Sequence, residues 1–217
     1  MNSAQSHFEV AEQFDEPRQQ VEANLLGMWV FLATEVLMFG GLFLGYAVYR
    51  TQFGDVFAEA STHLRLPLSA ANTVVLLTSG MTMSLADPAV QRGRRRRLLT
   101  LLAATMALGV LFLGIKGYEY ALELHESLVP IGGLPFHYPG AEPDKARIFF
   151  SFYFVMTGLH AIHMTVGLGV LAILAILAWR WRAPDRLARQ VRITGMYWAF
   201  VDIVWLFIFS ALYLLHA

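Results

Sequence analysis

The stretch LLGMWVFLATEVLMFGGLFLGYAVY, residues 25–49, contains a single acidic residue, Glu35, in an otherwise apolar run. Its 25 residues are enough for an α-helix to cross a bilayer with some tilt. An ionisable side chain near the middle of such a helix is costly in lipid, so it faces a protein interior or a water-filled path and usually pairs. Gly40 and Gly41 follow, small residues that let another helix approach. The stretch therefore predicts a transmembrane helix that packs within a larger membrane assembly.

Composition supports a membrane protein throughout. The chain has 217 residues, of which 57% are hydrophobic and 15% charged, and its mean hydropathy is +0.52. Soluble domains carry about 25% charged residues. The 16 basic and 16 acidic residues cancel, so no net charge indicates nucleic acid as a partner. The absence of cysteine excludes disulfides, thiolate metal sites and iron–sulfur clusters.

Four further apolar stretches are long enough to cross a membrane as helices. We predict an all-α integral membrane protein, a five-helix bundle preceded by a polar, acidic tail over residues 1–24, with one membrane domain over 25–217. The segment 130–147, rich in proline and glycine, should be the longest non-helical one. The fourth span is long enough that it should tilt or protrude. The predicted spans are residues 25–49, 68–87, 98–120, 148–178 and 193–215.

Basic residues are distributed unequally between the two ends of these spans. Eleven lie at one end, which comprises the N-terminal tail, the loop between spans two and three, and the loop between spans four and five. Five lie at the other end. The positive-inside rule then predicts a cytoplasmic N-terminus and a periplasmic C-terminus. Arginine runs could also form nucleic-acid patches, but topology explains them better. The run Arg94, Arg95, Arg96 and Arg97 is predicted to attract anionic phospholipid headgroups at the cytoplasmic surface.

Four ionisable residues fall near mid-span: Glu35, His160, His163 and Asp202. Depth along the helices predicts that they share one layer of the bundle. Three interpretations remain open: carboxylates and imidazoles that pair between helices, a proton relay, or ligation of a metal or haem by the two histidines. No second predicted span carries a histidine, so a redox centre held by this chain alone is not expected.

Small and aromatic residues add two packing predictions. Gly41 and Gly45 form a GxxxG pattern, which permits close backbone contact between helices. Trp198 and Trp205 share a face of the fifth span with Asp202 and should turn inward. Tyr213 is predicted to be an anchor at the membrane interface.

Four stretches then carry a resemblance. They read GMWVFLATEVLMFGGLF (27–43), ANTVVLLTSGMTM (71–83), YFVMTGLHAIHMTVG (153–167) and YWAFVDIVWLFIFSALY (197–213). In this order, and with Gly117-Tyr118-Glu119-Tyr120 at the end of the third span, they resemble subunit III of the haem–copper respiratory oxidases. The match touches all five spans.

The resemblance implies specific roles for several residues. Glu35 corresponds to the family's carbodiimide-reactive glutamate. Many members have seven helices, whereas this chain begins at the third, and Ala199 stands where a histidine is usual. The remaining family motif positions are Asn72, Glu119, His160, His163, Asp202 and Trp205.

The implied function is that of a non-redox core subunit of a proton-pumping cytochrome c oxidase in a bacterial plasma membrane. Such a subunit supports proton uptake, binds phospholipid and stabilises the catalytic subunit. Haem and copper are expected in that partner, and subunits I and II, with a larger respiratory supercomplex, are the expected neighbours. Subunit III of a quinol oxidase and the homologous accessory protein of nitric oxide reductase are alternatives. A transporter or membrane chaperone is a different class, but a transporter should show internal repeats or broken helices.

Overall fold

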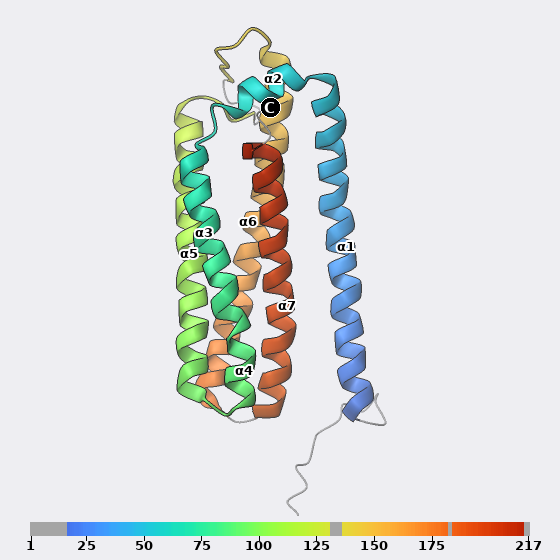
Figure 1. Ribbon diagram of the computed structural model, residues 1–217, viewed down its shortest axis with the longest axis vertical. Coiled ribbons are helices and arrows are strands. Elements are labelled where there is room, and N and C mark those ends of the chain that lie inside the picture. The colour runs from blue at the N-terminus through green and yellow to red at the C-terminus, as the bar shows by residue number, and fades with distance from the viewer. Residues whose placement is uncertain (1–16, 131–135, 182–183, 215–217) are drawn as a thin grey trace, which may run out of the picture.

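A computed structural model describes residues 17–130, 136–181 and 184–214. Within these ranges the chain is mostly helical, with no strand (Figure 1). Five of the helical stretches are long and apolar enough to cross a membrane, which confirms the predicted all-α bundle of five transmembrane helices. The helices are α1 (Pro17–Gln52), α2 (Gly54–Ser61), α3 (Leu66–Ser84), α4 (Ala86–Gln91), α5 (Arg95–His125), α6 (Pro143–Arg180), α7 (Pro184–Phe209) and the π-helix η1 (Ser210–Leu214).

Most helices extend beyond the predicted spans. α1 begins at Pro17, inside the predicted tail, and α7 begins at Pro184 rather than at residue 193. Hydropathy marks only the part of a helix that must be apolar, while polar turns continue the helix into the headgroup region. The 38-residue α6 fits the expectation that the fourth span is longer than the membrane requires.

Prolines mark helix starts more than ends. The helix α6 begins at Pro143, so the last part of the predicted non-helical segment 130–147 is helical. Proline is well placed there because the first turn of a helix needs no intrahelical N–H donor. The predicted second span, residues 68–87, is divided in the structure: α3 ends at Ser84, and Pro88 lies inside the short helix α4, which follows a break at Leu85. The short helix α2 was not predicted from the sequence. Residues 131–135 lie outside the described part.

The core lies among α3, α5, α6 and α7, and α1 stands beside it (Figure 1). α1 contacts the other helices along one line of its surface, where Leu32, Phe39 and Tyr46 are buried. Phe39 packs against the ring of Phe200, and Tyr46 donates a hydrogen bond to the carbonyl of Ala211. Large apolar side chains are exposed on the rest of the membrane window of α1, as lipid or a partner helix requires.

Glycines set the close approach of α5, α6 and α7. A Cβ added at Gly109 or Gly167 would meet the ring of Trp198, at 3.1 and 2.9 Å respectively. Trp198 is fully buried between them, as its position on the inward face predicts. On α1, Gly45 packs against Phe152, whereas a Cβ at Gly41 would meet no atom within 4 Å. Among the residues that the structure describes, therefore, only the second glycine of the GxxxG pattern packs against another helix.

Candidate functional site

A polar contact inside the membrane joins α1 to α6. The side chain of Glu35 reaches His163, with 3.0 Å between Oε2 and Nε2. Both side chains are about 15% exposed, at 15% and 14%, so the pair lies at the edge of the bundle rather than in its centre. A carboxyl group and an imidazole are thus paired between helices, which matches the first of the three interpretations left open by the sequence.

The other ring nitrogen of His163 restricts where the proton of this pair can be. Nδ1 lies 2.8 Å from the carbonyl oxygen of Leu159. Because a carbonyl only accepts, Nδ1 must carry a hydrogen. A neutral ring then presents Nε2 as an acceptor, so Glu35 must donate as a carboxylic acid. Alternatively, the ring is an imidazolium and Glu35 is a carboxylate. In both forms one proton lies between Glu35 and His163.

Aromatic residues hold the pair in place. The ring of Phe39 lies 5.4 Å from the ring of His163, measured between centroids. The hydroxyl of Tyr197 donates to the carbonyl of His163 at 2.9 Å, and Phe31 packs on Tyr197. The pair is therefore positioned by α1, α6 and α7 together.

The other two ionisable residues do not join this pair. His160 lies between the rings of Phe112 and Trp205, and neither of its ring nitrogens has a hydrogen-bond partner in the described part of the chain. Asp202 lies directly against Gly80 of α3. Residues three apart on a helix differ by about 60° in direction, so His160 and His163 face different neighbours. In the described part of the chain, Glu35 and His163 are the two of these four residues that form a hydrogen bond with each other, and the shared layer stays a prediction.

Two other family-motif residues form hydrogen bonds between helices. The amide Nδ2 of Asn72 donates to the carbonyl of Phe112 at 3.2 Å, which links α3 to α5. The indole of Trp205 donates to the hydroxyl of Thr73 at 2.9 Å, which links α7 to α3. Both side chains are fully buried, and the bonds satisfy donors that lipid could not.

Sequence reasoning missed a buried ionic cluster near the end of the bundle opposite the arginines. The ammonium of Lys116 donates to Glu119 at 2.9 Å, to the hydroxyl of Tyr153 at 2.9 Å and to that of Tyr213 at 2.8 Å. All three donors of this ammonium are thereby used. Lys116 is one of the five basic residues at the end of the spans opposite the arginines, yet its side chain is only 3% exposed.

Tyr213 completes this cluster from the C-terminal end. Its hydroxyl lies 2.7 Å from Glu119 Oε1, and its ring is fully buried, so the prediction of an interfacial anchor is wrong. The residue lies in the π-helix η1, and Lys116 faces its ring, with 5.4 Å between Nζ and the ring centroid. The spacing of Lys116, Glu119 and Glu123 places them on one helix face, which is the signal that could have revealed the cluster.

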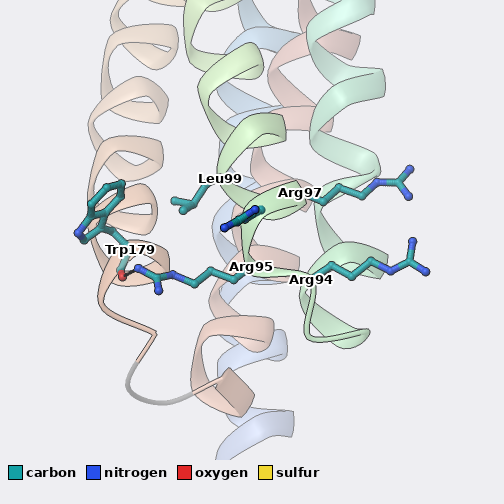
Figure 2. Close-up of a pocket in the computed structure, with 6 residues that line it drawn as sticks. Arg94, Arg95, Arg97, Leu99 and Trp179 are labelled. Atoms are coloured by element: carbon teal, nitrogen blue, oxygen red, sulfur yellow. Dashed lines mark hydrogen bonds between the residues drawn. The ribbon is translucent and has the colours of Figure 1, made fainter.

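The predicted lipid-binding arginines lie at the start of α5. All four side chains, Arg94 to Arg97, are exposed and line a surface hollow with Leu99 and Trp179 (Figure 2).

In the described ranges, no group of three or more histidine, aspartate and glutamate side chains is placed to hold a metal ion.

Comparison with known proteins agrees with this arrangement. The family model described as cytochrome c oxidase subunit III matches residues 15–129 and 142–217. The chain belongs to the cytochrome c oxidase subunit III family. The resemblance seen in the sequence is thereby confirmed, and with its five apolar helices the chain is a multi-pass protein of the plasma membrane.

Relatives within the family carry two kinds of name. The chain is 32% identical over 205 residues to a cytochrome c oxidase subunit 3 of Thermostichus vulcanus, which covers 93% of this chain and 92% of the relative. It is 30% identical over 208 residues to a probable quinol oxidase subunit 3 of Staphylococcus saprophyticus, covering 94% and 95%. A cytochrome c oxidase subunit 3 of Synechocystis is 31% identical over 198 residues, covering 89% and 76%. Relatives of this chain therefore include subunits named for cytochrome c oxidases and subunits named for quinol oxidases.

Proposed function

We propose that this chain is a non-redox core subunit of a terminal oxidase, which supports proton uptake, binds phospholipid and stabilises the catalytic subunit. Haem and copper belong to the catalytic partner in this proposal, with subunits I and II as neighbours in the respiratory membrane. The observation that carries it is the Glu35–His163 pair, which holds one proton at the edge of the bundle in a member of the subunit III family.

The pair suits a proton-holding role better than a purely structural one. The shared proton can move between Oε2 of Glu35 and Nε2 of His163 without separating the two helices, because in either position one atom donates to the other across the same contact. The partial exposure of both side chains leaves the pair open to a neighbouring subunit. His160, by contrast, is enclosed by Phe112 and Trp205.

Oxygen uptake followed over time tests the accessory role. Complexes with and without this chain should begin at comparable rates, and the depleted complex should lose activity sooner during turnover. This is expected because slower proton delivery leaves reactive intermediates in place for longer. A zero initial rate in the depleted complex, with its haem–copper centre spectroscopically intact, would contradict the proposal.

A single variant then tests the pair itself. In Glu35→Gln the amide can still donate to Nε2, so the helix contact is retained while the proton that the pair shares is lost. We expect an unchanged initial rate and faster inactivation, as in the depleted complex. The control is Asp55→Asn, an exposed acid on α2, which should behave as wild type. If Glu35→Gln keeps its oxygen-uptake activity for as long as wild type, the Glu35–His163 pair has no part in the proposed function.

The electron donor separates two candidates. We favour a cytochrome c oxidase, and the relative named a probable quinol oxidase subunit 3 supports the alternative at a similar identity. The purified complex should oxidise reduced cytochrome c. Turnover with a quinol and none with cytochrome c would establish the alternative.

A further inference from the structure

The buried cluster around Lys116 contains more acids than its ammonium can balance. Lys116 is paired with Glu119, with 2.9 Å between Nζ and Oε2. Glu123 lies one turn further along α5 and is also buried, at 4% exposure. If both acids were ionised, the cluster would carry a net negative charge away from water. Because an unbalanced charge is very costly to bury, one of the two acids must be neutral.

Hydrogen bonds identify Glu119 as the ionised acid of the two. Its carboxylate accepts from Lys116, from the hydroxyl of Tyr213 at 2.7 Å and from the hydroxyl of Ser69 at 3.2 Å. Three donors directed at one carboxylate stabilise its negative charge. In the described part of the chain, neither side-chain oxygen of Glu123 has a hydrogen-bond partner. Glu123 is therefore the acid that carries a proton.

The groups that face Glu123 decide what happens when this proton leaves. Those with a charge or a phenol hydroxyl are Lys116, Glu119, Tyr120 and Glu126 of α5 and Tyr153 of α6. Lys116 is the cation among them, and its three donors are already directed to Glu119, Tyr153 and Tyr213. A Glu123 carboxylate would have to draw Lys116 or the hydroxyl of Tyr153 away from these partners.

Glu123 lies close to the aqueous phase although it is buried. The helix α5 ends at His125, and the next residue, Glu126, is exposed and pairs with Arg65 at 2.8 Å. At a rise of 1.5 Å per residue, Glu123 is about 4.5 Å from Glu126 along the helix axis. The N–H of Leu128 donates to the carbonyl of Glu123 at 3.0 Å and closes this last turn. Since helix ends open readily, a local opening gives water access to the carboxyl group.

We propose that Glu123 is a proton-binding site that exchanges with the aqueous phase at the end of the bundle opposite the arginines. With the proton bound, the cluster is neutral, because Glu119 balances Lys116. On release, the O–H bond of Glu123 breaks, a base in that aqueous phase takes the proton, and a carboxylate remains beside Lys116. This inference goes beyond the proposed function and shares no residue with the Glu35–His163 pair.

Release of the proton should weaken the contacts of η1. Tyr213 of η1 accepts from Lys116 and donates to Glu119. In the same π-helix, the carbonyl of Ala211 accepts from Tyr46 of α1 at 2.9 Å. A second negative charge that attracts Lys116 would loosen Tyr213 and, through η1, the end of α1. The proton on Glu123 therefore stabilises the place where α1, α5, α6 and η1 meet.

Infrared difference spectroscopy of the full chain in mixed micelles detects this proton. A protonated carboxyl group has a C=O stretching band that a carboxylate lacks. Wild type at neutral pH should show such a band, which disappears reversibly at mildly alkaline pH. Glu123→Gln should lose this band. The control Glu142→Gln removes an exposed acid at the same end of the bundle and should keep it.

The pH dependence of stability provides a second measurement. At neutral pH a solvated glutamate of the unfolded chain has released its proton, whereas Glu123 in the folded chain keeps it. The folded state then binds more protons, so the free energy of unfolding should fall as the pH rises. In Glu123→Gln this slope should be shallower by the equivalent of one proton, and in Glu142→Gln it should match wild type. A purely structural role would change stability without changing the slope.

The outcomes separate binding of the proton from its exchange. A titrating band that persists in Glu123→Gln would place the proton on another residue and overturn the site. A band that is absent from Glu123→Gln but does not titrate in wild type before the chain unfolds would contradict exchange. If Glu123→Gln does not fold, isotopic labelling of glutamate in Glu35→Gln replaces it, since the titrating band must then shift. None of these results alters the test of the Glu35–His163 pair.

Discussion

At the scale of single residues, Lys116 shows how a charge is accommodated in the membrane. Its ammonium is buried with one carboxylate and two phenol hydroxyls as hydrogen-bond partners. It also lies within 6 Å of the ring centroids of Tyr153 and Trp205, where cation–π attraction adds to the ion pair. Glu123, one turn beyond Glu119, is buried with no hydrogen-bond partner in the described part. The stability of this region therefore depends on how the positive charge of Lys116 offsets the neighbouring carboxyl groups of Glu119 and Glu123.

Removing the lysine charge should make the end of the bundle opposite the arginines easier to unfold. In Lys116→Met, Glu119 is left buried without its cation, which should lower the free energy of unfolding by about 3–5 kcal/mol. Equilibrium unfolding in mixed micelles, followed by circular dichroism, measures the loss. Adding Glu119→Gln to this variant should restore part of it. The matched control Lys145→Met breaks an exposed ion pair with Glu142 and should cost less than about 1 kcal/mol. Equal losses at the two lysines would contradict the role of burial.

At the scale of helices, small residues decide how closely α6 and α7 approach. The ring of Trp198 lies against the backbone of α6 at Gly167, and its indole donates to Ser79 of α3 at 3.2 Å. The ring cannot move away without losing this bond. The contact between the two helices therefore depends on the absence of a side chain at one position.

Two glycines on the same helix provide a matched test. In Gly167→Ala, the new Cβ would lie 2.9 Å from the ring of Trp198, so the helices must shift and the free energy of unfolding should fall by about 1–3 kcal/mol. At Gly169 a Cβ would meet no atom within 4 Å, and Gly169→Ala should cause no loss. The same unfolding assay measures both. A loss of stability in Gly169→Ala as large as in Gly167→Ala would show that backbone effects, not packing, dominate.

At the scale of the whole molecule, α1 is attached differently from the other four spans. Only 11% of its membrane window is buried in this chain, against 50% for the span formed by α7 and η1. In the described part of the chain, the attachment includes a line of aromatic contacts, the hydrogen bond from Tyr46 to Ala211 and the Glu35–His163 pair. A partner subunit or lipid must cover the rest of α1 in the membrane.

Loss of one aromatic contact should loosen α1 as a unit. Phe39 is 2% exposed and packs on both His163 and Phe200. Phe39→Ala should therefore broaden the distribution of distances between α1 and α6. Because the chain has no cysteine, spin labels at Val48→Cys and Ile162→Cys report this distance by pulsed electron resonance. Leu37→Ala is the control, since that side chain is 75% exposed. An unchanged distribution in Phe39→Ala would show that other contacts suffice to hold α1.

The sequence by itself determined the number and type of the transmembrane elements. A helix in lipid must satisfy its backbone internally and stay apolar over about 20 residues, so hydropathy along the chain reveals it without knowledge of its neighbours. The same reasoning indicated that Glu35 needs a partner. The sequence motifs also indicated the subunit III family, which the family-model match over residues 15–129 and 142–217 confirms. The predicted orientation in the membrane stays a prediction.

Only the tertiary structure decided which polar groups meet. His163 rather than His160 pairs with Glu35, and Lys116 joins Tyr153 and Tyr213 from separate helices. These partners depend on how each helix is rotated about its axis and how far it is shifted along it. Hydropathy does not encode either quantity, because an apolar helix can be rotated in lipid at little cost. The rotation is fixed by close packing, as at Gly167 and Trp198, and packing exists only once the helices have assembled.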